Sequence, residues 1–268
     1  MTRILVPFST ISLISIVSLA GFFIGISTSI AASPLPAAPS VTLTVEHCDG
    51  HQLLVTADQP VYLSQLLALS DWRKCNYPFG AHLSFAAREP AQLALQQRLL
   101  AFLHHVVGAE SNQQQATDAQ VYFQQVLNLV SQQAVTGRRP VSLIDPKAIE
   151  LAINQDPIVR TGAVLRLVNR PDSIQLVGFH RISLRHAPAQ TITDYVRAAG
   201  LLPGLVPGQV WVIQANGQVD QLRYGAWTYN AAAVSPGAWV MALAPKRWIR
   251  DYPAFNEDLA SWLVTQSF

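Results

Sequence analysis

The segments "VRTGAVLRLVNRP" at residues 159–171 and "VSPGAWVMALAP" at residues 234–245 share one pattern, and this pattern decides the fold. Each has a glycine followed by an alanine and a short apolar run, and each ends at a proline. Glycine permits a tight turn before a strand, and proline cannot continue the hydrogen-bond ladder of a sheet. Each segment is therefore expected to be the closing strand of a module, and the repetition predicts that one small β-rich module occurs twice.

The residues before the first segment predict the opening of a β-grasp module. "VTLTVEH" at 41–47 alternates apolar and polar residues, "CDG" makes a turn, and "HQLLVTADQP" at 51–60 returns as a second strand. In "VYLSQLLALSDW" at 61–72, Leu63, Leu66 and Leu67 fall on one helical face. The order is strand, strand, short helix.

The same order precedes the second segment. "SIQLVGF" at 173–179 and "RISLRHAPAQ" at 181–190 have the composition of strands. "TITDYVRAAGLLPG" at 191–204 predicts a short helix, with Thr191 or Thr193 as its N-cap and Gly200 after its end. A hairpin follows at 209–224, with Asn216-Gly217 at its turn. The prediction is an α+β fold of two tandem β-grasp (ubiquitin-like) domains, at 41–171 and 172–250.

An insertion at 86–137 differs from the rest of the first domain because it carries helical periodicity. The spacing of Leu95, Leu99 and Val106 predicts one apolar stripe, and that of Phe123, Leu127 and Val130 predicts another. Thr117 and Gln120 have the spacing of a capping box. We expect a helical hairpin whose stripes pack on each other and on the sheet.

The last stretch, 251–268, predicts a C-terminal amphipathic helix. Asn256 is the candidate N-cap, and Leu259, Trp262 and Leu263 fall on one face. About three turns are marginal as a free helix and too short to span a bilayer. The helix must therefore dock on its own domain or on a partner.

The N-terminal 31 residues have the pattern of a secretory signal peptide, and 32–40 form a Pro/Ala-rich linker. Arg3 is followed by an apolar run and then by small residues near Ala31 and Ala32. A retained membrane anchor is the alternative, because the apolar run is long enough to span a bilayer. Either interpretation places the rest of the chain outside the cytoplasm, and cleavage leaves a mature periplasmic chain without a transmembrane span.

The chain has two cysteines, Cys48 and Cys75, both in the exported part. An even pair in an oxidising compartment predicts one disulfide. A metal or redox pair is the alternative, but the Cys-x-x-Cys spacing typical of such sites is missing.

No signature of catalysis, cofactor binding or metal binding is found in the sequence. It has no His-Glu-x-x-His pair, no G-x-S-x-G elbow and no phosphate-binding glycine loop. A formal net charge of +2 without a long basic block argues against nucleic acid as a partner. A glycoside hydrolase or lyase stays open as an alternative, because sequence does not place two carboxylates across a cleft.

The chain from about Val41 to its C-terminus resembles the GfcC family of periplasmic capsule-biosynthesis proteins. The resemblance is carried, in order, by "TGRRPVSLID" (136–145), "NQDPIVRTGAVLRLVNRPDSIQLVGF" (154–179), "TITDYVRAAG" (191–200), "VWVIQANGQV" (210–219), "GAWTYN" (225–230) and "SPGAWVMAL" (235–243). It implies two β-grasp domains similar to the SLBB modules of outer-membrane polysaccharide exporters, with the C-terminal helix folded back. It also implies a non-catalytic role in capsule or exopolysaccharide assembly, with the polysaccharide or the export machinery as partner. A structural stabiliser of the export assembly is a further alternative.

Six side chains are candidates for binding an acidic glycan or stacking on sugar rings. Arginines pair with acidic groups, and exposed aromatic faces stack on sugars. The candidates are Arg98, Arg138, Arg139, Trp227, Tyr229 and Trp248. For the arginines, the alternative is a solvated or domain-bracing role. Trp211 and Trp239, which lie within predicted strands, are expected in the core.

Overall fold

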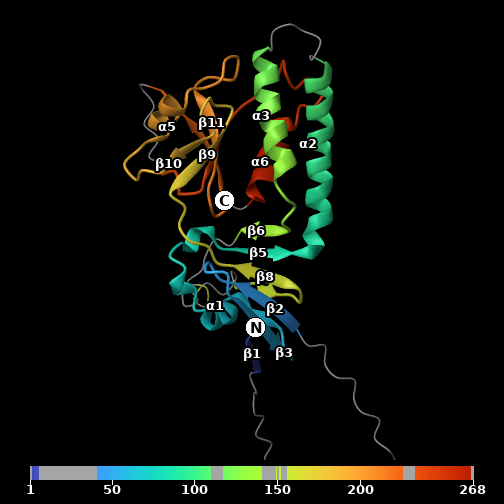
Figure 1. Ribbon diagram of the computed structural model, residues 1–268, viewed down its shortest axis with the longest axis vertical. Coiled ribbons are helices and arrows are strands. Elements are labelled where there is room, and N and C mark those ends of the chain that lie inside the picture. Colours follow the sequence, from blue (N-terminus) through green and yellow to red (C-terminus); the bar gives the residue numbers. More distant parts are fainter. Residues whose placement is uncertain are drawn as a thin grey trace, which may run out of the picture.

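The computed structural model describes residues 2–5, 41–109, 117–140, 149, 151, 156–225 and 233–266 (Figure 1). Two β-sheets follow one another along the chain, and two long helices stand beside the second sheet. Residues 6–40, which hold most of the predicted signal peptide and the linker, lie outside the described residues.

The first module is a sheet with one helix packed on it. Its strands are β2 (Val41–Glu46), β3 (Gln52–Ala57), β5 (His82–Phe85), β6 (Arg138–Pro140) and β8 (Ala163–Arg166), and its helix is α1 (Leu63–Leu69). The strand order is β3-β2-β8-β5-β6, with β2 and β8 parallel and the other neighbours antiparallel. As the helical spacing predicts, Leu63, Leu66 and Leu67 are buried, and Ser70 after the helix is buried too.

Shorter elements complete this module. They are the strands β1 (Thr2–Leu5), β4 (Val61–Tyr62) and β7 (Ile158–Val159), and the 3-10 helices Trp72–Lys74, Pro78–Gly80 and Ala86–Arg88. Strand β1 lies parallel to β3, and β4 pairs with β7. The disulfide Cys48–Cys75, with Cα atoms 5.7 Å apart, joins the β2–β3 turn to the segment after α1 and confirms the predicted pairing.

The second module repeats this arrangement. Its elements are β9 (Ser173–Val177), β10 (Ser183–Arg185), α5 (Ile192–Ala199), β11 (Gln209–Ile213), β12 (Val219–Arg223) and β13 (Trp239–Ala242). The strand order is β10-β9-β13-β11-β12, with β9 and β13 parallel. Thr191 caps α5 in a reciprocal capping box with Asp194, and Gly200 follows its end. Both sheets therefore have the β-grasp order, in which the last strand lies between the first and the third.

The two glycine-led segments occupy the same place in the two modules. The Gly162 N–H donates to the Thr42 carbonyl and the Gly237 N–H to the Ser173 carbonyl, both at 2.8 Å. Both glycines have positive φ, 79° and 74°, a conformation that suits glycine. β8 and β13, the central strands, begin directly after these turns. The predicted duplication is confirmed.

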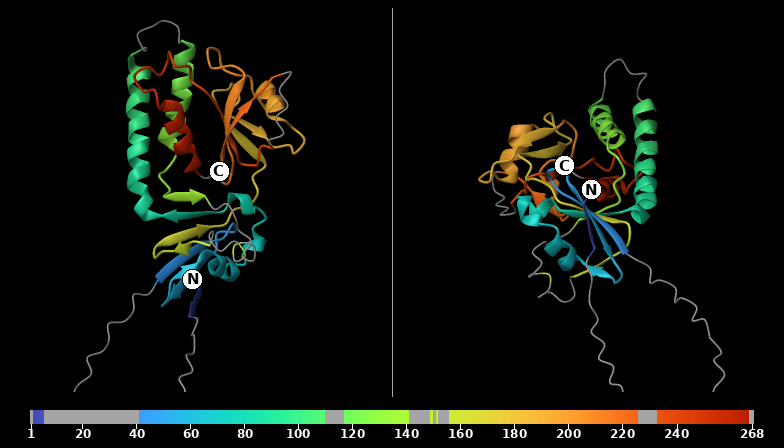
Figure 2. Two further views of the ribbon diagram at one scale, coloured as in Figure 1. Left: turned by 180° about the vertical axis from the view of Figure 1, so that it is seen from behind. Right: turned by 60° about the horizontal axis from the view of Figure 1, so that its bottom comes forward.

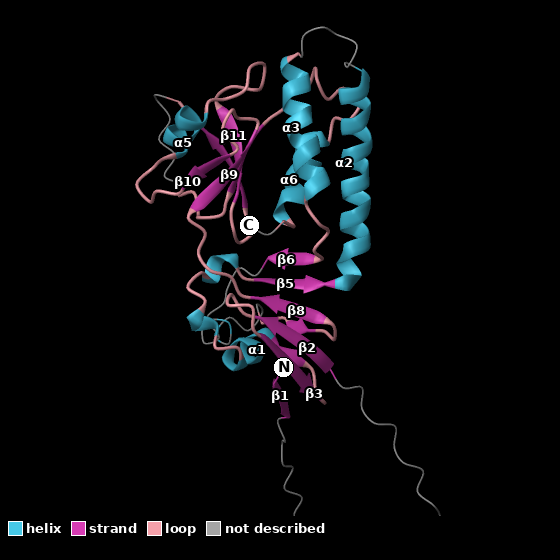
Figure 3. Ribbon diagram, viewed as in Figure 1, coloured by secondary structure: helices cyan, strands magenta, loops and turns pink. Residues whose placement is uncertain are grey.

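The insertion at 86–137 is a helical hairpin, as predicted. It consists of α2 (Glu89–Ala109) and α3 (Asp118–Gln132), between β5 and β6 (Figure 3). The corresponding strands of the second module, β11 and β12, are joined by the short turn that contains Asn216 and Gly217. The first module thus carries two helices where the second carries a turn.

The hairpin packs on the second module, although the chain attaches it to the first. Its buried residues belong to the same apolar cluster as the core of the second sheet; they are Leu99, Leu103, Tyr122, Phe123, Val126, Leu127 and Val130. Among the described residues, the core of the first module includes none from α2 or α3. The second sheet lies between α5 on one side and α3 and α6 on the other (Figures 1 and 2).

The C-terminal helix α6 (Phe255–Val264) docks on this same side, as expected, with Leu259, Trp262 and Leu263 buried. The N-cap prediction for Asn256 is wrong, because the N-cap is Ala254, two residues earlier, and the helix begins at Phe255. The Asn256 amide instead accepts from the Ala244 N–H and donates to the Ala244 carbonyl, at 3.1 and 3.0 Å. Within the described residues, no helix has the length and apolar character needed to cross a membrane.

Candidate functional site

The junction between the modules is held by side chains that reach across it. Arg138, at the start of β6, is 3% exposed, and its Nη2 donates to the Ala215 carbonyl at 2.8 Å. The Tyr77 hydroxyl donates to the Pro236 carbonyl at 2.5 Å, and the Thr136 hydroxyl to the Thr265 carbonyl at 2.7 Å. These bonds tie the first module to the second sheet and to the C-terminal helix.

Burial also changes the chemistry of Arg138. Removing the guanidinium from water disfavours its charged form and lowers its pKa to about 10. Its backbone carbonyl accepts from Gln92 Nε2 of α2, and Gln92 Oε1 accepts from the Gly137 N–H at 2.9 Å. The start of the hairpin, its exit and the second module therefore meet at this arginine.

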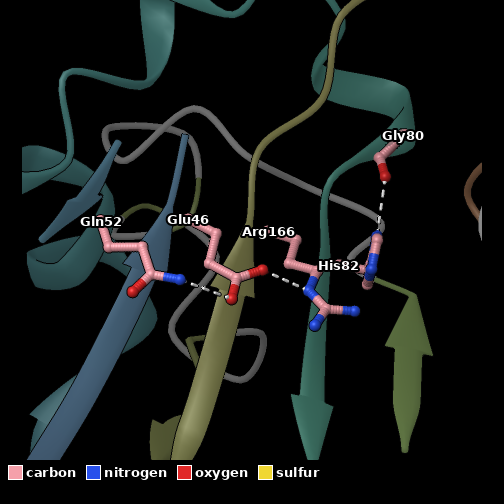
Figure 4. Close-up of polar contacts among 5 residues, drawn as sticks. All are labelled: Glu46, Gln52, Gly80, His82 and Arg166. Atoms are coloured by element: carbon pink, nitrogen blue, oxygen red, sulfur yellow. Dashed lines mark hydrogen bonds and ion pairs between the residues drawn. The ribbon is translucent and has the colours of Figure 1, made fainter. Parts of the chain in front are cut away.

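A row of polar side chains crosses the first sheet (Figure 4). It lies on the face opposite α1, because the alternate residues Leu43 and Val45 of β2 share a core with the α1 leucines. Gln52, Glu46, Arg166 and His82 are register partners in turn, from β3 through β2 and β8 to β5. Arg166 Nε lies 2.5 Å from Glu46 Oε2, and Gln52 Nε2 donates to Glu46 Oε1 at 3.2 Å. Both oxygens of the carboxylate are thus engaged.

His82 ends the row and is 1% exposed. Its Nδ1 lies 3.1 Å from the Gly80 carbonyl, which only accepts hydrogen bonds, so Nδ1 carries the proton. Burial, helped by the positive charges of Arg138 and Arg166, lowers the pKa of His82 to about 3. The ring is neutral at physiological pH and shielded from solvent.

The equivalent row of the second module is apolar and covered. There Val177, Met241 and Trp211 are register partners, and all three belong to the core beneath the helices. The first module keeps a polar face instead, where the side chains of Arg166 and Glu46 are 38% and 29% exposed. This contrast explains why the hairpin packs on the second sheet, which has apolar residues on both faces.

A second candidate surface is a hollow of about 600 Å³ between α3 and β9. Amide side chains and apolar side chains line it; they are Gln125, Asn128, Leu129, Gln132, Gln133, Gln175, Leu176, Val177, Ile182 and Trp239. Its size is within the range of small-ligand pockets, and none of these residues is charged. Sequence reasoning missed it because residues of α3 and β9 about 45 positions apart meet only through the unforeseen docking of the hairpin.

The predicted arginines do not form one patch. Arg98 of α2 is exposed, and its Nη2 pairs with Asp258 Oδ2 of α6 at 3.2 Å. Arg138 is buried at the junction, while its neighbour Arg139 is exposed. Their role in glycan binding stays a prediction, and the contacts of Arg98 and Arg138 suit the bracing alternative.

Of the three aromatic residues predicted to bind sugars, the structure describes only Trp248. Trp227 and Tyr229 lie outside the described residues. Trp248 is half-buried, and its ring centroid lies 6.2 Å from those of Tyr122 and Phe123. Trp211 and Trp239 are buried, as expected for strand positions.

Within the described part of the chain, no three His, Cys, Asp or Glu side chains gather as metal ligands would. The polar row also offers one carboxylate rather than the facing pair that glycoside cleavage uses. Its arrangement is suited to hydrogen bonding and charge pairing at a surface.

The fold and these surfaces define a tandem β-grasp protein with a helical brace. The chain belongs to the capsule biosynthesis GfcC family: residues 39–169 match its N-terminal model and residues 180–267 its C-terminal model. The N-terminal match ends at residue 169, between β8 of the first module and β9 of the second. No curated protein matches the chain.

Proposed function

We propose that this protein is a periplasmic, non-catalytic accessory protein of capsule or exopolysaccharide biosynthesis and export. It binds the polysaccharide, the outer-membrane export machinery, or both. Membership of the capsule biosynthesis family supports the process. The observation that carries the binding role is the partly exposed polar face of the first sheet, where Gln52, Glu46 and Arg166 reach solvent. Its counterpart in the second module is covered by helices.

The polar face supports recognition in preference to catalysis. Glu46 is held by Arg166 and Gln52, so its carboxylate already has partners on both oxygens. His82, the potential base of the row, is buried and has a strongly lowered pKa. A catalytic base must reach the proton that it abstracts, whereas these groups are fixed in a hydrogen-bonded row.

The junction supports a preorganised binding protein. Bonds from Tyr77, Thr136 and Arg138 fix the modules to one another, and the hairpin is part of the second core. A surface that spans rigid modules loses less conformational freedom on binding than a flexible one. The same rigidity favours the second candidate function, a structural stabiliser of the export assembly.

The test is to mix purified mature protein with surface polysaccharide from the producing cells and with detergent-solubilised exporter. The proposal expects saturable binding to at least one of them and an unchanged chain length of the polymer by light scattering. Arg166→Ala should weaken the interaction relative to Arg250→Ala, a control at an exposed position outside the first sheet, if the polar face makes the contact. Shortening of the polymer would instead establish an enzyme, and binding to neither would refute the proposal.

A further inference from the structure

We infer that the hollow between α3 and β9 binds uncharged sugar residues of a polysaccharide. The inference rests on the proposed function and adds the place and the chemical class of the ligand. The hollow lies between the inserted hairpin and the second sheet, and it shares no residue with the polar row of the first sheet. Its volume of about 600 Å³ suits a short stretch of a glycan chain.

The lining selects against charge. Five of its ten residues carry side-chain amides, and the other five are apolar. An amide offers both donors and acceptors, which match the hydroxyl and acetamido groups of sugars. An acidic sugar entering the same hollow would lose hydration without gaining a cation from the lining.

The hydrogen-bonding capacity of the lining is only partly used by the fold. Gln125 is committed, since its Oε1 accepts from the Gly178 N–H at 2.7 Å and its Nε2 donates to the Phe179 carbonyl at 2.9 Å. Within the described residues, no hydrogen bond uses the side-chain amides of Gln132, Gln133 and Gln175. One amide therefore fixes α3 to β9, and three others are left for a ligand.

Trp239 forms part of the wall of the hollow. Its side chain lines the hollow and is 6% exposed. The indole nitrogen is itself buried, so Trp239 contributes apolar surface to the wall rather than a hydrogen-bond donor.

The apolar lining suits the other side of a sugar ring. Ile182, at 61% exposure, lies at the rim, and Leu129 lines the α3 side. The C–H face of a pyranose can cover such side chains while its hydroxyls reach the amides. The arrangement combines apolar contact with a few polar groups, as small-ligand sites do.

The test begins with an array that carries neutral and acidic bacterial oligosaccharides, probed with the full mature protein. The strongest binder is then titrated by calorimetry against wild type, Gln132→Ala and Gln175→Ala. Each substitution removes one or two neutral hydrogen bonds and should weaken binding about five- to tenfold. Gln97→Ala, at an exposed position of α2 outside the hollow, is the matched control and should bind as wild type.

The outcomes separate this inference from the proposed function. Neutral oligosaccharides as the main binders, weakened by both hollow variants, support the inference. Glycan binding that neither variant changes, or that is confined to acidic oligosaccharides, overturns it and leaves the proposed function standing. Binding to no oligosaccharide overturns the inference too. The proposed function then depends only on whether the protein binds the solubilised exporter.

Discussion

Gly137 shows how a single residue permits the inserted hairpin to join the first sheet. It has φ of 63°, and a Cβ atom there would lie 2.3 Å from the Phe85 carbonyl oxygen. The Phe85 N–H donates to the Gly137 carbonyl at 3.0 Å. The added Cβ would therefore clash with Phe85, the residue whose backbone pairs with Gly137 where the hairpin rejoins the sheet. A side chain cannot be accommodated without moving the backbone of β5.

We therefore predict that Gly137→Ala lowers the free energy of unfolding by about 3 kcal/mol, from backbone strain and displacement. Gly108→Ala in α2 is the control, because its added Cβ meets nothing within 4 Å. In a helix this change should be neutral or slightly stabilising. Urea denaturation measures both, and equal stability of the two variants would contradict the argument.

His82 predicts a pH dependence of stability. Its pKa is lowered from 6.5 to about 3, chiefly by burial, so between these values the unfolded chain binds a proton that the folded chain does not. Acid therefore favours unfolding, and the stability contributed at neutral pH is lost as the pH falls toward 3. The loss between pH 7 and pH 4 should be roughly 3 kcal/mol.

The measurement is the difference in urea stability between pH 7 and pH 4 for wild type and His82→Gln. The variant should lose less stability in acid, whereas the exposed-site control His180→Gln should keep the full dependence. Identical acid sensitivity of wild type and His82→Gln would show that His82 is protonated in the folded state.

Arg138 and Arg139 are adjacent in sequence but differ in environment. Arg138→Ala removes a charged donor from the Ala215 carbonyl and should cost about 2–3 kcal/mol. Arg139→Ala, at an exposed site, should stay within about 0.5 kcal/mol of wild type. Thermal unfolding of the two variants checks the difference, and a loss at Arg139 as large as that at Arg138 would contradict it.

At the scale of elements, local sequence patterns predict most of the structure. The alternation in 41–46, the leucines of α1 and the N-cap threonine of α5 specify strands and helices through their nearest neighbours. The same patterns do not say which surface an apolar stripe meets, so the docking of α2 and α3 on the second sheet was not predicted. Asn256 was misassigned for a related reason, because its partner, Ala244, is fixed by tertiary packing.

The disulfide stabilises the elements around α1. Cys48 and Cys75 are separated by 27 positions, and closing a loop of that length should stabilise the fold by about 3.5 kcal/mol in the chain-entropy model. We expect Cys48→Ser/Cys75→Ser to unfold at lower urea concentration by the corresponding amount. Dithiothreitol should leave the urea midpoint of the double variant unchanged. The same reduction should lower the midpoint of the wild type toward that of the variant. A wild-type midpoint that reduction leaves unchanged would contradict the prediction.

At the scale of the whole molecule, the inserted hairpin couples the stability of the second module to the first, because residues of the first module's insertion complete the second core. Seven of its side chains are buried in the second core, at roughly 1.5–3 kcal/mol each. This total is comparable with the whole stability of a typical domain. The candidate sites also belong to this scale. The alternation in 41–46 places Thr42, Thr44 and Glu46 on one face of β2 but does not identify that face as a site, and the hollow exists only through the docking of α3 on β9.

The most direct test replaces residues 86–136 with Asn-Gly, the turn that the second module has in the same place, and follows amide hydrogen exchange by mass spectrometry. The account predicts that β2, β5 and β8 keep slow exchange, because their core contains no hairpin residue among those described, while β9, β11 and β13 lose protection. Full protection of the second sheet in this variant would contradict the claim that the hairpin completes the core of the second module.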